Sequence, residues 1–322
     1  MIKCGRLISM LVCTGLLIAC LAGCGIAAED SGKAEYANTE EFYAVDDDVG
    51  TEGETMAEKI SITDLETDSE TEAEQASVES DEEETSWEGM SLSIFGDSIS
   101  TFDGYIPEGY GVFFPFDGEV TEVSQTWWMK LIEDTGMELC ANSSSAGSTC
   151  VGDSLSAENP KYGCSSFRIS SLTGKQGKMP DVIIIYMGTN DLLTGVPIGD
   201  NDGTNLVEEG TVENFSDAYT LILDKVSSDY PTSQIYCCTL VPVGEWGTNV
   251  PYVTFTNHLG LTAEYYSMQI RIIAKNKGIP VLDLYHCGIE IDNLHEMTTD
   301  GVHLTPAGME CVERAILDGM KN

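Results

Sequence analysis

The sequence predicts an α/β fold, and three observations support that prediction. The run DVIIIYM at residues 181–187 is continuously apolar and β-branched, which is typical of a parallel strand buried on both faces. Four other short apolar runs are separated by segments with helical periodicity. Glycine or proline stands near several of the segment ends. Strands that alternate with helices form a parallel sheet covered on both sides.

The expected elements follow one another in a regular order. Strands are predicted at residues 91–95, 137–141, 181–187, 234–241 and 281–285, with helices at 126–134, 215–226, 261–277 and after 305. Thr305 can cap the last helix, with Pro306 at its first position. In the helix at 261–277 we expect Tyr265, Met268 and Ile272 to face the core. The pattern therefore predicts a flavodoxin-like three-layer α/β/α sandwich with a mostly parallel sheet of about five strands.

The charge divides the chain into two parts. The 322 residues include 54 acidic and 15 basic side chains, a net charge of −39. Residues 29–88 hold 23 of the acids but only Lys33 and Lys59, and they show no sustained apolar period. Such composition is typical of a disordered, self-repelling chain, although a solvated acidic helix around residues 56–65 is an alternative. We predict an acidic disordered tether at 25–88 and one folded domain at 89–322. The excess of acids excludes nucleic acid as the main partner, because phosphate binding needs basic patches.

The N-terminus has the pattern of an export signal. Lys3 and Arg6 precede an apolar run at residues 7–22, which ends in Leu21-Ala22-Gly23-Cys24. The segment resembles a bacterial lipoprotein signal, in which the lipobox ends in cysteine. That resemblance implies that residues 1–24 are a signal peptide with its lipobox and that Cys24 carries the lipid. The protein would then be extracytoplasmic and lipid-anchored to the cell membrane. An uncleaved transmembrane anchor is the alternative, although the apolar run is short for a span.

Polar motifs follow the expected strands at the ends where ligands bind in parallel sheets. They contain Ser98 after the first strand, Gly147 after the second, Asn190 after the third, and Asp300 with His303 before the last helix. A serine nucleophile needs a base, so His303 can take the Ser98 proton while Asp300 orients the imidazole. The backbone N–H groups of Ser98 and Gly147 and the Asn190 amide can hold the oxyanion. Asp97 and Asp191 are expected to be hydrogen-bonding braces rather than acids.

The four motifs, Gly96-Asp97-Ser98, Ser145-Ala146-Gly147, Gly188-Thr189-Asn190-Asp191 and Asp300-Gly301-Val302-His303, resemble the SGNH hydrolase superfamily of GDSL esterases and lipases over residues 90–320. The resemblance implies the catalytic and oxyanion roles given above for Ser98, Gly147, Asn190, Asp300 and His303. Ala146 and Leu304 depart from the usual pattern without touching a catalytic group. A second G-D-S motif at Ser154 follows a polar stretch instead of an apolar strand, so it is not expected to carry the nucleophile.

These observations predict a serine esterase that acts through an acyl-serine intermediate and requires no cofactor and no metal. The acidic domain fits neutral ester substrates, such as short acyl or acetyl groups, including those on polysaccharide. Two alternatives remain open: an O-acyltransferase on the same triad, and a non-catalytic glycan-binding surface lipoprotein. Six aromatic residues in the loop after Ser98 either form an acyl- or sugar-binding wall or simply pack: Phe102, Tyr105, Tyr110, Phe113, Phe114 and Phe116.

Overall fold

The computed structural model describes residues 86–245 and 252–321, and the structural statements below concern these residues. The predicted signal peptide at 1–24, with Cys24, lies outside them, as does the predicted tether up to residue 85. The packed part of the described chain begins at Trp87, which is 6% exposed and joins the core. That residue lies two positions before the predicted domain start at 89.

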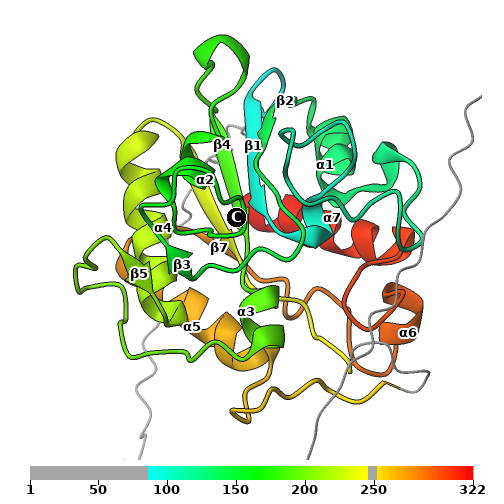
Figure 1. Ribbon diagram of the computed structural model, residues 1–322. Helices are drawn as coiled ribbons and strands as arrows, with labels where there is room; N and C mark the ends of the chain where they lie inside the picture. The colour runs from blue at the N-terminus through cyan, green and yellow to red at the C-terminus, as the bar shows by residue number, and fades with distance from the viewer. Residues whose placement is uncertain (1–85, 246–251, 322) are drawn as a thin grey trace, which may run out of the picture. The chain divides into compact units, whose positions relative to one another are not determined.

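The core of the described chain is a five-stranded parallel sheet with strand order β2-β1-β4-β6-β7 (Figure 1). Its strands are β1 (Ser91–Gly96), β2 (Glu138–Asn142), β4 (Val182–Tyr186), β6 (Gln234–Cys238) and β7 (Val281–Leu282). Every residue of β4 is buried, as its continuous apolar run predicts. The predicted α/β class and the parallel sheet are therefore confirmed.

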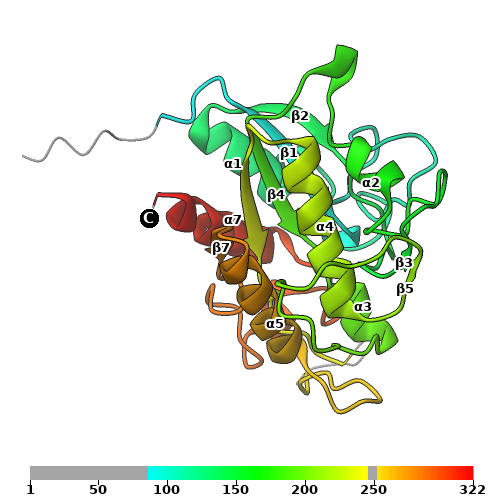
Figure 2. The ribbon, with the colours of Figure 1, turned by 90° about the vertical axis from the view of Figure 1, so that its left-hand side faces the viewer.

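Helices cover both faces of this sheet. Helices α1 (Trp127–Thr135) and α7 (Pro306–Met320) lie on one side, and α4 (Phe215–Asp229) lies on the other (Figure 2). Helix α4 contacts both α2 (Ser166–Ser170) and α5 (Ala263–Asn276). The remaining short elements of the described chain are the 3₁₀ helices Ser98–Ser100, Val123–Gln125 and Lys175–Gly177, the helices α3 (Thr189–Thr194) and α6 (Leu294–Met297), and the antiparallel pair β3 (Gly152–Asp153) and β5 (Thr211–Val212). None of the helices in the described ranges is long and apolar enough to cross a membrane.

Local sequence explains where the long helices begin and end. The Thr126 side chain accepts a hydrogen bond from the Met129 N–H and so caps α1. The same helix ends at Gly136, whose φ of 73° is costly for any other residue type. Helix α7 begins at Pro306 with Thr305 as its cap, as predicted.

The predicted buried face of α5 is wrong. Tyr265, Met268 and Ile272 are 47%, 49% and 37% exposed, respectively. The helix instead buries another set at helical spacing, namely Tyr266, Ile270 and Ile273. Both sets are apolar, so periodicity alone does not choose between them, and the contacts of α5 with α4, β6 and β7 decide.

Strand register brings the ends of three strands to one edge of the sheet. Gly96 pairs with Tyr186, so β1 and β4 end at the same level. Ile94 pairs with Asn142, the last residue of β2. The chain then leaves these strands toward the predicted site residues Ser98, Gly147 and Asn190.

Candidate active site

The nucleophile candidate Ser98 lies on a short helical turn directly after β1. Asp97 caps this turn, because its carboxylate accepts a hydrogen bond from the Ile99 N–H at 3.0 Å. Burial raises the pKa of the Asp97 carboxyl to about 6. Ser98 itself is only 7% exposed. The turn therefore holds Ser98 at the edge of the sheet, where neighbouring groups cover nearly all of the residue.

The structure brings Ser98, His303 and Asp300 into one hydrogen-bonded chain. His303 Nε2 lies 2.9 Å from Ser98 Oγ, and His303 Nδ1 lies 2.8 Å from Asp300 Oδ2. The other Asp300 oxygen accepts hydrogen bonds from the backbone N–H groups of His303 and Val302. Burial opposes ionisation of Asp300, but the hydrogen bonds and charge of His303 outweigh it and hold the pKa of this carboxyl below its ordinary value. Such a chain can move a proton from the serine to the imidazole.

Three hydrogen-bond donors near the ends of these strands have no acceptor within the described chain. Asn190 Nδ2 is buried without a hydrogen-bond partner. The backbone N–H groups of Ser98 and Gly147 likewise donate to no group in residues 86–245 and 252–321. Gly147 adopts φ of 71°, a left-handed conformation that glycine adopts without strain. Unpaired donors of this kind are what an oxyanion requires, because an acceptor can bind them without displacing another partner.

Asp191 braces the loop that carries Gly147. Its carboxylate accepts hydrogen bonds from the backbone N–H groups of Cys150 and Val151, at 2.8 and 3.3 Å. Burial raises the pKa of Asp191 to about 7, although these hydrogen bonds favour the ionised form. The contacts of Asp97 and Asp191 agree with the bracing role predicted for both.

Arg168 is a buried residue that sequence reasoning missed. Its side chain is fully buried, and its Nη2 donates to the carbonyls of Gly96 and Ser143, at 3.0 and 2.6 Å. Its Nη1 donates to the carbonyl of Pro160. One guanidinium thus ties together the chain leaving β1, the chain leaving β2 and the loop before α2. Burial lowers the pKa of Arg168 to about 10, which leaves it charged at neutral pH. No sequence motif marks this residue.

The second G-D-S motif has a structural role. Ser154 is fully buried, and its hydroxyl accepts a hydrogen bond from the Gly210 N–H at 2.9 Å. This contact lies beside the β3–β5 pair, where Asp153 pairs with Thr211. Of the other histidines, His286 contacts Asp283 and His295 lies near Glu296, both outside the Ser98 chain.

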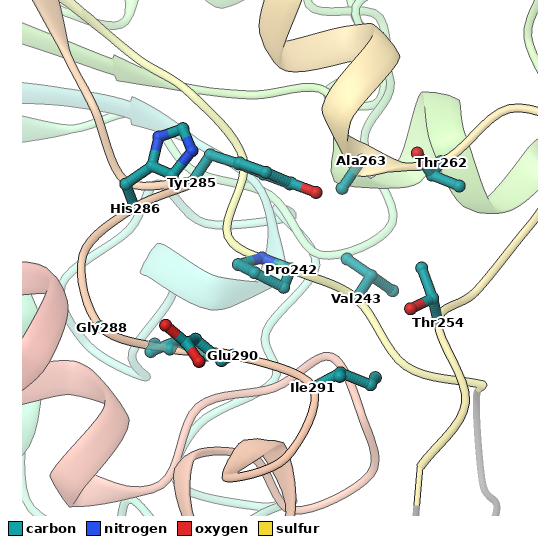
Figure 3. A pocket seen from close by; sticks show the side chains of 11 residues that line it. Pro242, Val243, Thr254, Thr262, Ala263, Tyr285, His286, Gly288, Glu290 and Ile291 are labelled. Carbon is teal, nitrogen blue, oxygen red and sulfur yellow. The ribbon is translucent and has the colours of Figure 1, made fainter.

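A cavity of about 300 Å³ lies beyond the ends of β6 and β7 (Figure 3). Its lining is largely apolar and includes Pro242, Val243, Tyr285 and Ile291. Figure 3 shows the Tyr285 hydroxyl directed toward Ala263. None of Ser98, Asp300 and His303 lines this cavity. In the described ranges, no group of three His, Cys, Asp or Glu side chains could hold a metal ion.

The chain matches a known protein family. The model of the GDSL-like lipase/acylhydrolase family matches residues 90–281, which is more than half of the chain. A comparison with curated proteins found no match.

The chain is also similar to solved structures. A protein from Bacteroides uniformis described as a GDSL-like lipase is 25% identical, with a TM-score of 0.51, over 71% of this chain and 94% of that one. A similarly described protein from Bacteroides ovatus is 26% identical, with a TM-score of 0.49, over 72% of this chain and 98% of that one. A Lactobacillus plantarum protein, 18% identical with a TM-score of 0.54, matches over 72% of this chain and 96% of its own. Together with the family match, the parallel sheet and the polar residues at its edge lead to one conclusion: the protein belongs to the GDSL-like lipase/acylhydrolase family, within the SGNH superfamily, and is an ester hydrolase.

Proposed function

We propose that the protein hydrolyses carboxylic esters through an acyl-serine intermediate on Ser98. The observation that carries this proposal is the hydrogen-bonded chain from Ser98 through His303 to Asp300. As Ser98 Oγ bonds to the ester carbonyl carbon, its proton passes to His303 Nε2 and the carbonyl π electrons move to oxygen. The resulting oxyanion accepts hydrogen bonds from the unpaired donors of Ser98, Gly147 and Asn190.

The intermediate then collapses and the acyl group leaves in a second step. The bond to the leaving alcohol breaks as His303 returns the proton to the alcohol oxygen. Water next attacks the acyl carbon as His303 takes its proton. The bond from this carbon to Ser98 Oγ then breaks, His303 returns the proton to Ser98 Oγ, and the carboxylic acid is released. Asp300 stays ionised throughout and faces the imidazolium, which is consistent with its lowered pKa.

We propose short acyl or acetyl groups on carbohydrate as the substrate class. Ser98 is only 7% exposed, which favours a small acyl group at the reacting carbon. The side chain of Phe116 is 68% exposed, and its backbone N–H donates to the Phe113 carbonyl. The ring of Phe113 in turn stacks on His303. An exposed aromatic ring one turn from the site offers a flat apolar surface for a sugar ring. The net charge of −20 on residues 89–322 favours neutral over polyanionic esters.

The first test compares two serines that share the same local motif. The purified protein should hydrolyse p-nitrophenyl acetate, Ser98→Ala should abolish this activity, and Ser154→Ala should retain it if the variant folds. Equal activity in wild type and Ser98→Ala would refute the role of Ser98. A panel of acetylated glycans and of longer p-nitrophenyl esters then tests the substrate class, with turnover expected to fall as the acyl chain lengthens.

We also propose that a lipid on Cys24 tethers the protein to the cell membrane, on its extracytoplasmic side. This proposal rests on the sequence pattern around Leu21-Ala22-Gly23-Cys24. Cys24→Ser should abolish incorporation of a labelled fatty acid in cells that express the full chain. Labelling that persists in Cys24→Ser would contradict the proposal.

A further inference from the structure

The ring of Phe113 lies flat against the imidazole of His303. The two ring centroids are 3.5 Å apart, and the planes are inclined by only 11°. Phe114 meets the same imidazole differently, edge-on at 6.4 Å and 85°. One face of the His303 ring is therefore covered by an aromatic π face, while its two nitrogens lie within hydrogen-bond distance of Ser98 and Asp300.

Backbone contacts hold Phe113 in place independently of His303. The Phe113 N–H donates to Thr101 Oγ1 at 3.0 Å, and the Thr101 hydroxyl in turn donates to the Ser98 carbonyl at 2.9 Å. The stacking ring is thus linked to the nucleophile through a single threonine.

The same loop is also fastened to the segment that carries Gly147. The Gly111 N–H donates to Ser145 Oγ at 3.0 Å, and the Ala146 N–H donates to the Gly111 carbonyl at 2.9 Å. A Cβ at Gly111 would lie 2.9 Å from the Ala146 carbonyl oxygen, so glycine is needed for this close approach. The position of Phe113 is therefore set by both halves of the site.

His303 is surrounded both by charged groups and by the Phe113 ring, which can each stabilise a positive charge on the imidazole. Asp300 Oδ2 lies 2.8 Å from Nδ1, and the buried Asp97 lies close enough to interact electrostatically with His303 and with Arg168. These groups approach from other elements, whereas Phe113 is stacked on the ring face. The face of an aromatic ring is electron-rich and attracts a cation within about 6 Å of its centroid.

We propose that Phe113 is a positioning residue that also stabilises the imidazolium form of His303 through a cation–π interaction. This inference rests on the proposed function, in which His303 becomes a cation each time it takes the Ser98 proton. Because the neutral imidazole gains less from the ring face than the cation does, the interaction lowers the barrier to acylation.

The test lowers the electron density on the face of the Phe113 ring and leaves the shape of the ring nearly constant. Phe113 is replaced by phenylalanine carrying one, two or three ring fluorines, which progressively withdraw electrons from the π face. The logarithm of kcat/KM for p-nitrophenyl acetate should fall steadily along the series, with a total loss of about two- to thirty-fold, the range expected for a cation–π contact. A ring that merely packs predicts the same kcat/KM for all members.

Phe114 provides the matched control, because its ring is nearly perpendicular to the same imidazole and its centroid lies 6.4 Å away, instead of being stacked at 3.5 Å. The same fluorinated series at Phe114 should produce no such progressive loss. Phe113→Trp should retain more activity than Phe113→Leu, since indole binds cations better than benzene and leucine offers no π face. Thermal unfolding of each variant identifies any that lose activity through misfolding.

The outcomes separate this inference from the proposed function. If kcat/KM stays constant across the fluorinated Phe113 variants while Ser98→Ala is inactive, only the cation–π inference is overturned. Activity that persists in Ser98→Ala would instead overturn the serine mechanism on which the inference rests. Equal slopes at Phe113 and Phe114 would also overturn the inference, because they would indicate a packing effect.

Discussion

Asn190→Leu should lower kcat and at the same time raise the free energy of unfolding. Asn190 Nδ2 is buried with no acceptor in the described chain, so the folded protein bears the desolvation cost of an unpaired donor. That cost is about 1–3 kcal/mol for a neutral polar group. Leucine has a similar size and no such donor, so the variant should be more stable by up to this amount. For a domain of 234 residues, each kcal/mol shifts Tm by about 2–4 °C.

Activity should fall sharply in the same variant. If the Asn190 amide holds the oxyanion, its loss should lower kcat by about 10²–10³, or roughly 2.7–4 kcal/mol. The assay is hydrolysis of p-nitrophenyl acetate, together with thermal unfolding of the same preparation. A buried, unpaired donor that serves catalysis is the reason that the two free energies should have opposite signs.

Asn257→Leu is the matched control. Asn257 is a buried residue whose Nδ2, unlike that of Asn190, has partners: it donates to the Leu192 carbonyl at 3.3 Å and to the Tyr266 hydroxyl at 3.2 Å. Asn257 Oδ1 also accepts from the backbone N–H groups of Leu259 and Leu261, both at 3.0 Å. Leucine at position 257 leaves these two donors without their acceptor, so this variant should be less stable than the wild type by about 1–3 kcal/mol. An Asn190→Leu variant that keeps kcat within threefold of wild type, or that lowers Tm as much as Asn257→Leu does, would contradict an oxyanion role for the Asn190 amide.

Three further predictions follow from buried contacts around the site. Arg168→Met removes the guanidinium donor from the carbonyls of Gly96, Ser143 and Pro160, and the Gly96 carbonyl keeps the Ser145 N–H as a donor. The loss at the other two carbonyls should lower the free energy of unfolding by about 2–6 kcal/mol in urea titrations, and unchanged unfolding would contradict the linking role of Arg168. Asp97 keeps its proton up to about pH 6 in the folded protein but releases it near pH 3.8 when unfolded, so its contribution to stability should decline as pH rises through this window, by about 3 kcal/mol in total. Asp97→Asn should lack that decline when both proteins are unfolded in urea from pH 4 to pH 7, and parallel stability curves would show that Asp97 does not titrate there. Gly111→Ala places a Cβ 2.9 Å from the Ala146 carbonyl oxygen and should reduce kcat/KM at least tenfold, as measured with p-nitrophenyl acetate; an unchanged value would show that the loop adjusts without cost.

Short-range patterns made much of the fold predictable. The β-branched run at β4 and the Thr305–Pro306 start of α7 are local features, and the structure places both as expected. The buried face of α5 could not be predicted in the same way, because this helix carries two apolar stripes. Tyr265 and Tyr266 are neighbours in sequence, yet only the packing of α5 against the rest of the domain determines which one is buried.

In the candidate site, too, some residues could be predicted from local motifs and others could not. The order of the motifs predicted five site residues, because each follows or precedes an element whose end is recognisable in the sequence: Ser98, Gly147, Asn190, Asp300 and His303. Arg168 and Phe113 could not be identified as partners of these residues. Arg168 is the third residue of a five-residue helix, and nothing in its neighbourhood shows that its side chain reaches Gly96, 72 positions earlier.

By itself, the sequence determined the class of fold, the side chains proposed to react and the division of charge along the chain, because these depend on residue type, spacing and composition. Only the tertiary structure decided which donors remain unpaired, which loops Arg168 joins and which ring lies on His303. The physical reason is the distance along the chain between the residues that interact. Strand and helix patterns arise from neighbours a few positions apart, whereas the contact between Phe113 and His303 joins residues that come together only when the whole sheet and its loops have packed.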